Sequence, residues 1–485
     1  MAVKDLGPLQ MCLGGEWVGA SNGATQTVVN PATEEVIATV PSASAADVDG
    51  AVAAARQALD GAWSRMSARD RGRLVWKIGQ QLMTRADEVA RLETLHNGKP
   101  IFESRQIDIP SAAECFEYYA GWADKIQGET IPVKGPYFAY TLREPVGVVA
   151  AIVPWNFPLL LAVWKVAPAL VCGNTVVLKP ASQTPLTALA LAEIALEVGL
   201  PPGVLNVITG RGSEVGRLIV EHSGVDKIGF TGDTSTGREI MRGSAATVKR
   251  LTLELGGKSP NIVFADADLD AAVRGATTGI FYGKGEVCAA GSRLLVERSI
   301  KDEFLARLAA RAKKIRPGDP LDPKTRLGAI SSKGQLDRVL HYIETAQREG
   351  GTLIAGGQRA DIGTGKGYFV EPTVFADVTP EMTIAREEVF GPVLAAIEFA
   401  DVEEAIARAN QSDYGLAAAV WTRDIKKAHQ VAHRLQAGTV WINAYNVYDT
   451  AAPFGGYKQS GFGREMGQHA LDSYTQVKTV MVDLS

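Results

Sequence analysis

The segment PVGVVAAIVPWNFPLLLAVW, residues 145–164, decides how the chain folds. It carries no charged side chain and is long enough to cross a lipid bilayer. However, Pro154 and Pro158 lie on either side of a Trp-Asn-Phe tripeptide, and two helix-breaking residues there would leave backbone groups unpaired in lipid. We therefore interpret the segment as a strand over residues 146–153, a turn, and a helix over about 159–171. The strand is apolar on both faces, which is typical of a buried parallel sheet.

After this segment, strand-like and helix-like stretches alternate, which indicates a doubly wound α/β fold. We expect further strands at Thr175–Lys179, Val204–Thr209, Lys227–Thr231 and Arg250–Glu254. The helix after the first of these should begin with Thr184 as its cap and Pro185 at its first helical position. Because such sheets bind ligands at the carboxyl ends of their strands, a site is predicted at that edge. The residues there are Asn156, Lys179, Gly232 and Glu254.

The regions on either side of this unit predict further helices, a hairpin and a second α/β unit. Expected helices are Ser44–Leu59, with Ser44 as its cap, Ala68–His96, Lys301–Ile315 and Lys333–Arg348. Expected strands of the second unit, which begins near Lys258, include Tyr414–Trp421 and Thr439–Asn443. Residues 128–144 alternate apolar and polar side chains, as in a projecting hairpin. The strand-like segment 474–482 needs an edge to pair with, and this hairpin, of the same or another subunit, is a candidate.

The composition is that of a globular protein, and it excludes several classes of function. At 485 residues, with 46% hydrophobic and 21% charged side chains, the chain can form about three domains. Its formal charge of −4 indicates neither a nucleic-acid groove nor a membrane-binding surface. The cysteines, at positions 12, 115, 172 and 288, are too scattered for a disulfide framework or a zinc site. We expect no metal and, because the N-terminus has no secretory pattern, a cytoplasmic location.

The sequence GKGEVCAAGSR, residues 283–293, places a cysteine among glycines and small residues. Cys288 follows an apolar helical pattern and precedes the strand-like run 294–296, so it should lie in a turn whose backbone can approach a ligand. One interpretation is a buried cysteine that acts as a small hydrophobic residue. The other is a nucleophile, because a thiolate adds readily to an electrophilic carbon. The cysteine alone does not decide between them.

Several short motifs occur along the chain in a fixed order. They are PWNFP at 154–158, GFTG at 229–232, LELGGK at 253–258, the Cys288 turn, EEVFGP at 387–392 and PFGG at 453–456. In these motifs and their order the chain resembles the aldehyde dehydrogenase superfamily, in its hydrolytic, NAD(P)-dependent branch, over essentially its whole length. The resemblance implies oxidation of an aldehyde to a carboxylic acid. It also implies a homo-oligomer, either a dimer or a tetramer.

The resemblance divides the chain into three parts. Residues 1–125 and 146–257 would form a Rossmann-like NAD(P)-binding domain, and residues 258–470 a catalytic domain. Residues 126–145 and 471–485 would form a small β element for oligomerisation. The fold class is thus α/β, with a doubly wound parallel-sheet cofactor domain and a second α/β domain that carries the cysteine.

The resemblance also assigns catalytic roles. Cys288 would add to the aldehyde and form a thiohemiacetal, whose oxyanion binds the Asn156 amide and the Cys288 backbone N–H. Once hydride loss leaves a thioester, Glu254 would act as general base for the hydrolytic water. Lys165 and Glu465 resemble a proton-relay pair. Simpler interpretations are a helix cap or ion-pair partner for Glu254 and a turn residue for Asn156. Lys165 and Glu465 could equally be surface charges.

A glycine-rich stretch at 210–216 comes close to the dinucleotide fingerprint GxGxxG, but its third glycine is one residue late. The resemblance instead places the pyrophosphate at Gly232 and the helix that follows, where backbone N–H groups favour anions. Lys179 would bind the adenosine ribose, and Glu388 with Phe390 the nicotinamide ribose and ring. The full set of implied cofactor contacts is Ile152, Pro154, Trp155, Lys179, Ser182, Gly212, Phe230, Gly232, Asp233, Leu255, Glu388 and Phe390.

Two positions depart from the pattern of the family. Ser182 stands where many NAD-preferring relatives carry a glutamate that repels a 2′-phosphate, so NADP as well as NAD should be usable. Asp233 replaces the serine commonly found beside the pyrophosphate. Its carboxylate would repel phosphate unless it is solvated or paired with a neighbour such as Arg238.

An apolar tunnel is expected to lead the substrate to the cysteine. The implied substrate contacts are Phe157, Trp164, Val287, Ala289, Tyr448 and Phe454. Such a lining suits aliphatic or aromatic aldehydes better than charged ones. The alternatives are a semialdehyde dehydrogenase, for which the sequence offers no obvious arginine in the tunnel, and a non-catalytic binding protein of the same fold.

Overall fold

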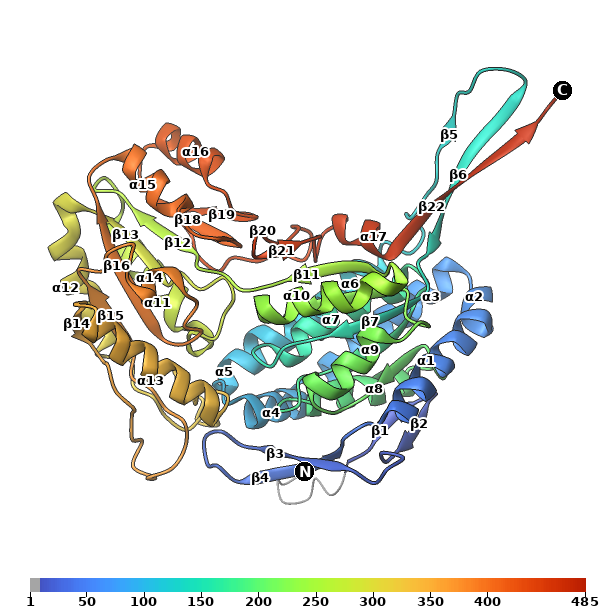
Figure 1. The fold of residues 1–485 in the computed structure, drawn as a ribbon, viewed down its shortest axis with the longest axis horizontal. Coiled ribbons are helices and arrows are strands. Elements are labelled where there is room, and N and C mark those ends of the chain that lie inside the picture. Colours follow the sequence, from blue (N-terminus) through green and yellow to red (C-terminus); the bar gives the residue numbers. More distant parts are fainter. Residues whose placement is uncertain (1–8) are drawn as a thin grey trace.

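The computed structural model describes residues 9–485, which form two large sheets and a projecting arm (Figure 1). The strands of the first sheet, in spatial order, are β2 (Glu16–Val18), β1 (Met11–Leu13), β9 (Leu205–Val207), β8 (Thr175–Lys179), β7 (Val148–Ile152), β10 (Lys227–Thr231), β11 (Arg250–Glu254) and β21 (Gly461–Phe462). From β9 to β11 the pairing is parallel, whereas β1 and β21 are antiparallel to their neighbours. The expected doubly wound sheet is confirmed.

Helices cover both faces of this sheet. They are α1 (Ala45–Asp60), α2 (Ala62–Arg65), α3 (Ala68–Thr84), α4 (Ala86–Asn97), α5 (Ile101–Glu103), α6 (Ile109–Ala120), α7 (Pro158–Val171), α8 (Leu186–Glu197), α9 (Arg217–Glu221) and α10 (Thr234–Ser244), with π-helical turns at Ser104–Asp108 and Gly212–Gly216. Val149 and Ala151 of β7 belong to the core that contains α3, α6, α7 and α8. Val148 and Ala150 belong to the core that contains α1, α9 and α10. Because successive strand residues point to opposite faces, β7 has to be apolar throughout.

The second sheet is parallel except at its first strand. In spatial order it contains β14 (Thr352–Ala355), β15 (Thr373–Ala376), β16 (Val393–Phe399), β13 (Arg293–Glu297), β12 (Pro260–Val263), β18 (Ala417–Trp421) and β19 (Thr439–Ile442). The remaining helices are α11 (Leu269–Phe281), α12 (Lys301–Ala312), α13 (Lys333–Arg348), α14 (Thr383–Arg386), α15 (Val402–Asn410), α16 (Ile425–Arg434) and α17 (His469–Tyr474). Two short ladders pair β3 (Thr25–Val29) with β4 (Val36–Pro41) and β17 (Tyr414–Gly415) with β20 (Tyr457–Lys458).

The arm that extends from the body in Figure 1 consists of β5 (Thr130–Ile131), β6 (Tyr137–Pro145) and β22 (Thr475–Asp483). β22 pairs antiparallel with β6 of the same chain along its whole length, from Thr475 opposite Pro145 to Asp483 opposite Tyr137. The hairpin is thus the edge that the late strand uses. The pairing lies within one chain rather than between subunits.

Several boundaries differ from expectation, and β7, β9 and α12 are each shorter than predicted. The helix predicted over 68–96 is two helices, because Arg85 leaves helical geometry (φ −100°, ψ 18°) and its guanidinium pairs with Glu88 and Glu193. α8 begins one residue late, with Pro185 rather than Thr184 at the cap position. The strand predicted over 414–421 breaks at residue 416, because its two halves pair in different sheets. Within residues 9–485, no helix is long and apolar enough to cross a membrane.

Candidate active site

The Cys288 turn follows directly from α11, at a point where the backbone leaves helical geometry. Gly283 and Lys284 both have left-handed backbone, with φ of 56° and 63°. Gly285 is left-handed as well, and a Cβ there would lie 2.2 Å from the Gly391 carbonyl oxygen. Only glycine tolerates that approach without strain, so this residue lets the turn pack against the second sheet's loops. The result places Cys288 where two cavities meet.

The first cavity, of about 460 Å³, is mostly apolar. Predicted substrate contacts among its lining residues are Phe157, Trp164, Val287, Tyr448 and Phe454. Ala289 is an exception: it is buried, lies outside the cavity lining, and its carbonyl accepts a hydrogen bond from Tyr445 Oη at 2.8 Å. The cavity lining does not support a substrate contact of Ala289, which stays a prediction.

The second cavity, of about 200 Å³, lies on the other side of the cysteine. Its lining includes Pro154, Trp155, Asn156, Gly232, Asp233, Leu255, Glu388 and Phe390, all of which the sequence predicted as site residues. Gln335 and Arg338 of α13 line it too and were missed. They donate hydrogen bonds to the carbonyls of Phe390 (2.7 Å) and Glu388 (2.9 Å). Neither residue lies in a recognisable motif. The only indication in the sequence is that the two lie three positions apart on a predicted helix, and so on the same face of it.

The electrostatics at the cysteine oppose its ionisation. Burial, with the Glu388 and Glu254 carboxylates nearby, raises the pKa of the Cys288 thiol to about 12. Burial and the charge of Glu465 raise the pKa of Glu254 well above its usual value. Neither carboxylate oxygen of Glu254 has a hydrogen-bond partner within residues 9–485. A buried carboxylate with raised pKa and free oxygens can take a proton from a thiol or from water.

Asn156 lies beside the cysteine at the start of α7. Its Nδ2 donates to the Glu286 backbone oxygen at 2.8 Å, and its Oδ1 is buried without a partner in the described chain. An amide nitrogen carries two hydrogens, so one remains for a second acceptor. This arrangement can present a donor to an oxygen that forms on a carbon attached to Cys288.

The comparisons with known proteins agree with this geometry. Residues 17–480 match the sequence profile of the Aldehyde dehydrogenase family. The chain belongs to that family.

It is 53% identical to DhaS of Bacillus subtilis, over 99% of this chain and 96% of that protein. It is 49% identical to the human mitochondrial aldehyde dehydrogenase, over 98% and 92% of the two chains. The structure of a Bacillus cereus aldehyde dehydrogenase in complex with NAD+ matches with a TM-score of 0.97 and 50% identity, over 99% and 97%. The protein is an NAD(P)-dependent aldehyde dehydrogenase.

In this aldehyde dehydrogenase the second cavity has groups that suit the nicotinamide end of a dinucleotide. Gly256 carries no Cβ, and one placed there would lie 2.4 Å from Glu388 Oε2, so bare backbone lines the cavity at that point. Glu388 Oε1 accepts the Gly257 N–H at 3.0 Å, and burial raises the pKa of its carboxyl to about 7. Trp155 and Phe390 meet edge to face, with ring centroids 5.2 Å apart. An apolar ring platform beside a fixed carboxylate suits a nicotinamide riboside.

The predicted adenosine contacts of this dehydrogenase lie outside the cavity lining. Lys179 is buried at the end of β8, where its Nζ donates to the Pro180 carbonyl at 2.9 Å and burial lowers its pKa to about 8. Its side chain passes about 3.9 Å from the Cβ position of Gly216, which brings it to the π-helical turn that Gly212 begins. Ser182 is partly exposed nearby in sequence. Ile152 and Phe230 are buried in their strands.

Asp233 caps α10 of the dehydrogenase. Its carboxylate accepts hydrogen bonds from the Ser235 backbone N–H at 2.7 Å and from the Ser235 hydroxyl. Of the two alternatives for Asp233, pairing with Arg238 is not seen, since Arg238 donates to Gln459 Oε1 at 2.9 Å, whereas Asp233 is exposed to solvent as the other alternative requires. A cap so close in sequence outcompetes a long side chain, since the helix needs a partner for its free N–H groups.

Lys165 and Glu465 form a buried ion pair, so neither is a surface charge. Lys165 Nζ also donates to Thr231 Oγ1 at 2.6 Å, and Glu465 lines the first cavity with Glu254. Within residues 9–485, no group of His, Cys, Asp and Glu side chains is placed to hold a metal ion.

Proposed function

We propose that this aldehyde dehydrogenase oxidises neutral, apolar aldehydes to carboxylic acids by covalent catalysis at Cys288. The observation that carries the proposal is that Cys288 lines both cavities, so one sulfur can contact an aldehyde on one side and face the cofactor cavity on the other. Bound NAD supplies the hydride acceptor. Pro154, Trp155, Gly232, Leu255, Glu388 and Phe390 would hold it.

The chain's own residues divide the remaining work. Once the Cys288 thiol has lost its proton, to Glu254 or to water, Sγ forms a bond to the carbonyl carbon while the C=O π bond opens, and the free hydrogen of Asn156 Nδ2 stabilises the oxygen as it becomes negative. When the carbon is a thioester, Glu254 takes a proton from the attacking water, whose oxygen displaces the sulfur and leaves the carboxylic acid. Glu465 and Lys165 would pass that proton onward from Glu254.

The charges of the first cavity support neutral substrates over semialdehydes. Its lining contains the acids Glu114, Glu254, Asp449 and Glu465 and no lysine or arginine. Glu114 and Asp449 are exposed and so mark where the cavity meets solvent. A substrate carboxylate would find no cation in this lining and would face the exposed carboxylates of Glu114 and Asp449, which favours hexanal or benzaldehyde over succinate semialdehyde by an expected tenfold or more in kcat/KM, or about 1.4 kcal/mol.

For the cofactor, we propose that NAD is used and that NADP is also accepted. Ser182 carries no charge to oppose a 2′-phosphate, and Lys179 lies close to it in sequence. The arm β5-β6-β22 would serve a homodimer or homotetramer, because its apolar side chains Tyr137, Phe138 and Met481 are exposed. The four free cysteines suit a reducing compartment such as the cytoplasm.

Mass spectrometry of the acid-quenched enzyme tests the covalent route. During turnover of hexanal with NAD, a peptide containing Cys288 should gain the mass of a hexanoyl group. An acyl group on another residue, or none when NADH forms in a burst, would contradict the proposal. A panel of neutral, anionic and cationic aldehydes tests the substrate class separately.

A further inference from the structure

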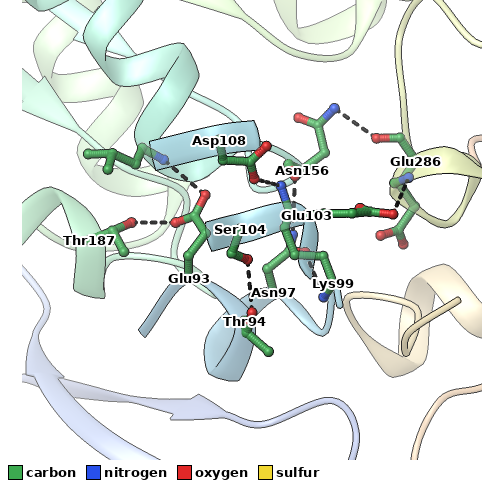
Figure 2. Close-up of polar contacts among 12 residues, drawn as sticks. Glu93, Thr94, Asn97, Lys99, Glu103, Ser104, Asp108, Asn156, Thr187 and Glu286 are labelled. Atoms are coloured by element: carbon green, nitrogen blue, oxygen red, sulfur yellow. Dashed lines mark hydrogen bonds and ion pairs between the residues drawn. The ribbon is translucent and has the colours of Figure 1, made fainter. Parts of the chain in front are cut away.

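Figure 2 shows a set of buried polar side chains that includes Asn97, Asn156 and Glu286, the last of which lies two residues before Cys288. Asn97, Lys284 and Glu286 are all fully buried and line neither cavity at the cysteine. Burying a lysine and a glutamate is costly unless they are paired. Glu286 and Lys284 lie two and four residues before the nucleophile, so packing alone does not explain why they are buried there.

Lys284 connects two segments far apart in sequence. Its Nζ donates to the backbone oxygen of Asn97 at 2.8 Å and to Asn97 Oδ1 at 3.0 Å. The same Nζ lies 2.7 Å from Glu286 Oε2 and forms a buried ion pair with it. The other carboxylate oxygen of Glu286 accepts the Ser331 backbone N–H at 3.0 Å. The ammonium is thus held on both sides, in a residue whose backbone is left-handed.

The two partners of Lys284, Asn97 and Glu286, both contact the segment that contains Asn156. Asn97 Nδ2 donates to the backbone oxygen of Trp155 at 2.6 Å, directly before Asn156. Asn156 Nδ2 in turn donates to the backbone oxygen of Glu286. The result is a closed ring: Lys284 to Asn97, Asn97 to the Trp155 backbone, Asn156 to Glu286, and Glu286 back to Lys284.

We propose that Lys284 is a positioning residue for oxidation, which fixes the Asn156 amide against the Cys288 turn through Asn97 and Glu286. With the ring intact, one hydrogen of Asn156 Nδ2 is tied to Glu286 and the other is held in a constant direction. The oxyanion donor is therefore oriented before the substrate arrives, and its stabilisation needs no rearrangement during the reaction. The inference rests on the proposed role of Asn156 as oxyanion donor.

The rest of the buried cluster does not belong to this ring. Lys99 pairs with Asp108, and its ammonium lies 4.0 Å from the centroid of the Phe157 ring. Glu93 accepts from Thr187 at 2.8 Å. Neither group has a side-chain contact with Lys284 or Glu286, so these residues fix the surrounding helices rather than the amide.

The test uses the full-length enzyme and the variant Lys284→Met, with Lys284→Met/Glu286→Gln as the form that leaves no unpaired buried charge. Stopped-flow measurement of the NADH burst should show hydride transfer slower by about tenfold to 100-fold in both, with NAD affinity within about twofold of wild type. Lys227→Met is the matched control, since Lys227 is equally buried but donates to Thr252 at 3.0 Å. It should lower the melting temperature without slowing the burst.

A double-mutant cycle decides whether Lys284 acts through Asn156. In an Asn156→Ala background, Lys284→Met should slow the burst by no more than about twofold further, because the group that it orients is gone. The same loss in both backgrounds, a wild-type burst in the Lys284 variants, or an equal loss in Lys227→Met would overturn the inference. If Asn156→Ala itself leaves the burst unchanged, the proposed oxyanion role fails instead.

Discussion

Two buried lysine–glutamate pairs flank the nucleophile, and they differ in what they touch. Lys165 and Glu465 lie beside the first cavity, where the charge of Glu465 helps to raise the pKa of Glu254. Lys284 and Glu286 line neither cavity and contact backbone and amide groups. The first pair is placed to affect proton transfer and the second to affect geometry. Buried ion pairs next to an active site can thus have different effects, which depend on the groups that each pair contacts.

Removing the sulfur should abolish the reaction that both pairs serve. Cys288→Ser keeps the shape of the side chain, but a hydroxyl ionises far less readily than a thiol in the same place and is a weaker nucleophile, so turnover should fall by at least about 10³-fold. Steady-state NADH formation measures this, and NAD affinity with thermal unfolding shows whether the fold is intact. More than a tenth of wild-type turnover would refute the nucleophile assignment.

Glu254→Gln should separate the two halves of the reaction. The amide cannot accept a proton from water, so thioester hydrolysis should slow by about 10²-fold or more while hydride transfer is less affected. Pre-steady-state kinetics would then show a burst of NADH that is larger than in wild type. An equal loss of burst and steady-state rate would place Glu254 in activation of the cysteine. Kinetics at two pH values separate either role from a loss of folded enzyme.

Substituting one glutamate from each pair compares them directly. Glu465→Gln removes a charge that raises the Glu254 pKa, so that pKa should fall and the acid limb of the turnover profile should move to lower pH. The maximal rate should drop by about tenfold because the proton route is interrupted. Glu286→Gln should leave the limb in place and alter only the rate. An equal shift of the acid limb in both variants would contradict the distinction between the two ion pairs.

A charge placed outside both pairs should change cofactor preference and leave the chemical steps unaffected. Ser182 is partly exposed, so water screens a carboxylate there. Ser182→Glu should raise the ratio of kcat/KM for NAD over NADP by about tenfold, the equivalent of roughly 1.4 kcal/mol. Steady-state kinetics of both variants with each cofactor at fixed aldehyde provide the ratio. An unchanged ratio would mean that this position does not face the adenosine ribose.

The sequence predicted those helices and strands that depend on interactions between residues close together in the chain. β8, β10, β11 and α13 match expectation to the residue, because their apolar periodicity and end signals agree. The break at Arg85 could not be foreseen, since it depends on acids of another helix as well as its own.

The site shows the same division. The motifs identified Cys288, Asn156, Glu254 and Glu388, all of which line the two cavities. Asn156 and Glu254 could be placed together because they lie at the carboxyl ends of the parallel strands β7 and β11. Lys284 and Glu286 were visible in the cysteine motif, yet their roles depend on Asn97, which the sequence marked only as the end of a helix. The local contacts of Asp233 and Ala289 could not be predicted either, because side-chain direction is set by neighbours rather than by sequence position.

The pairing of β22 with β6 sets an order for events during synthesis. Pro145 and Thr475 face each other, yet 330 positions separate them (475 minus 145). At ribosomal rates of about 5–20 residues per second, β6 waits roughly 15 to 70 seconds for its partner strand. Throughout that time the backbone groups of its edge, with Phe138 and Leu142 beside them, face solvent and other nascent chains. The formation of the arm therefore depends on the rate of translation and on the distance between neighbouring ribosomes.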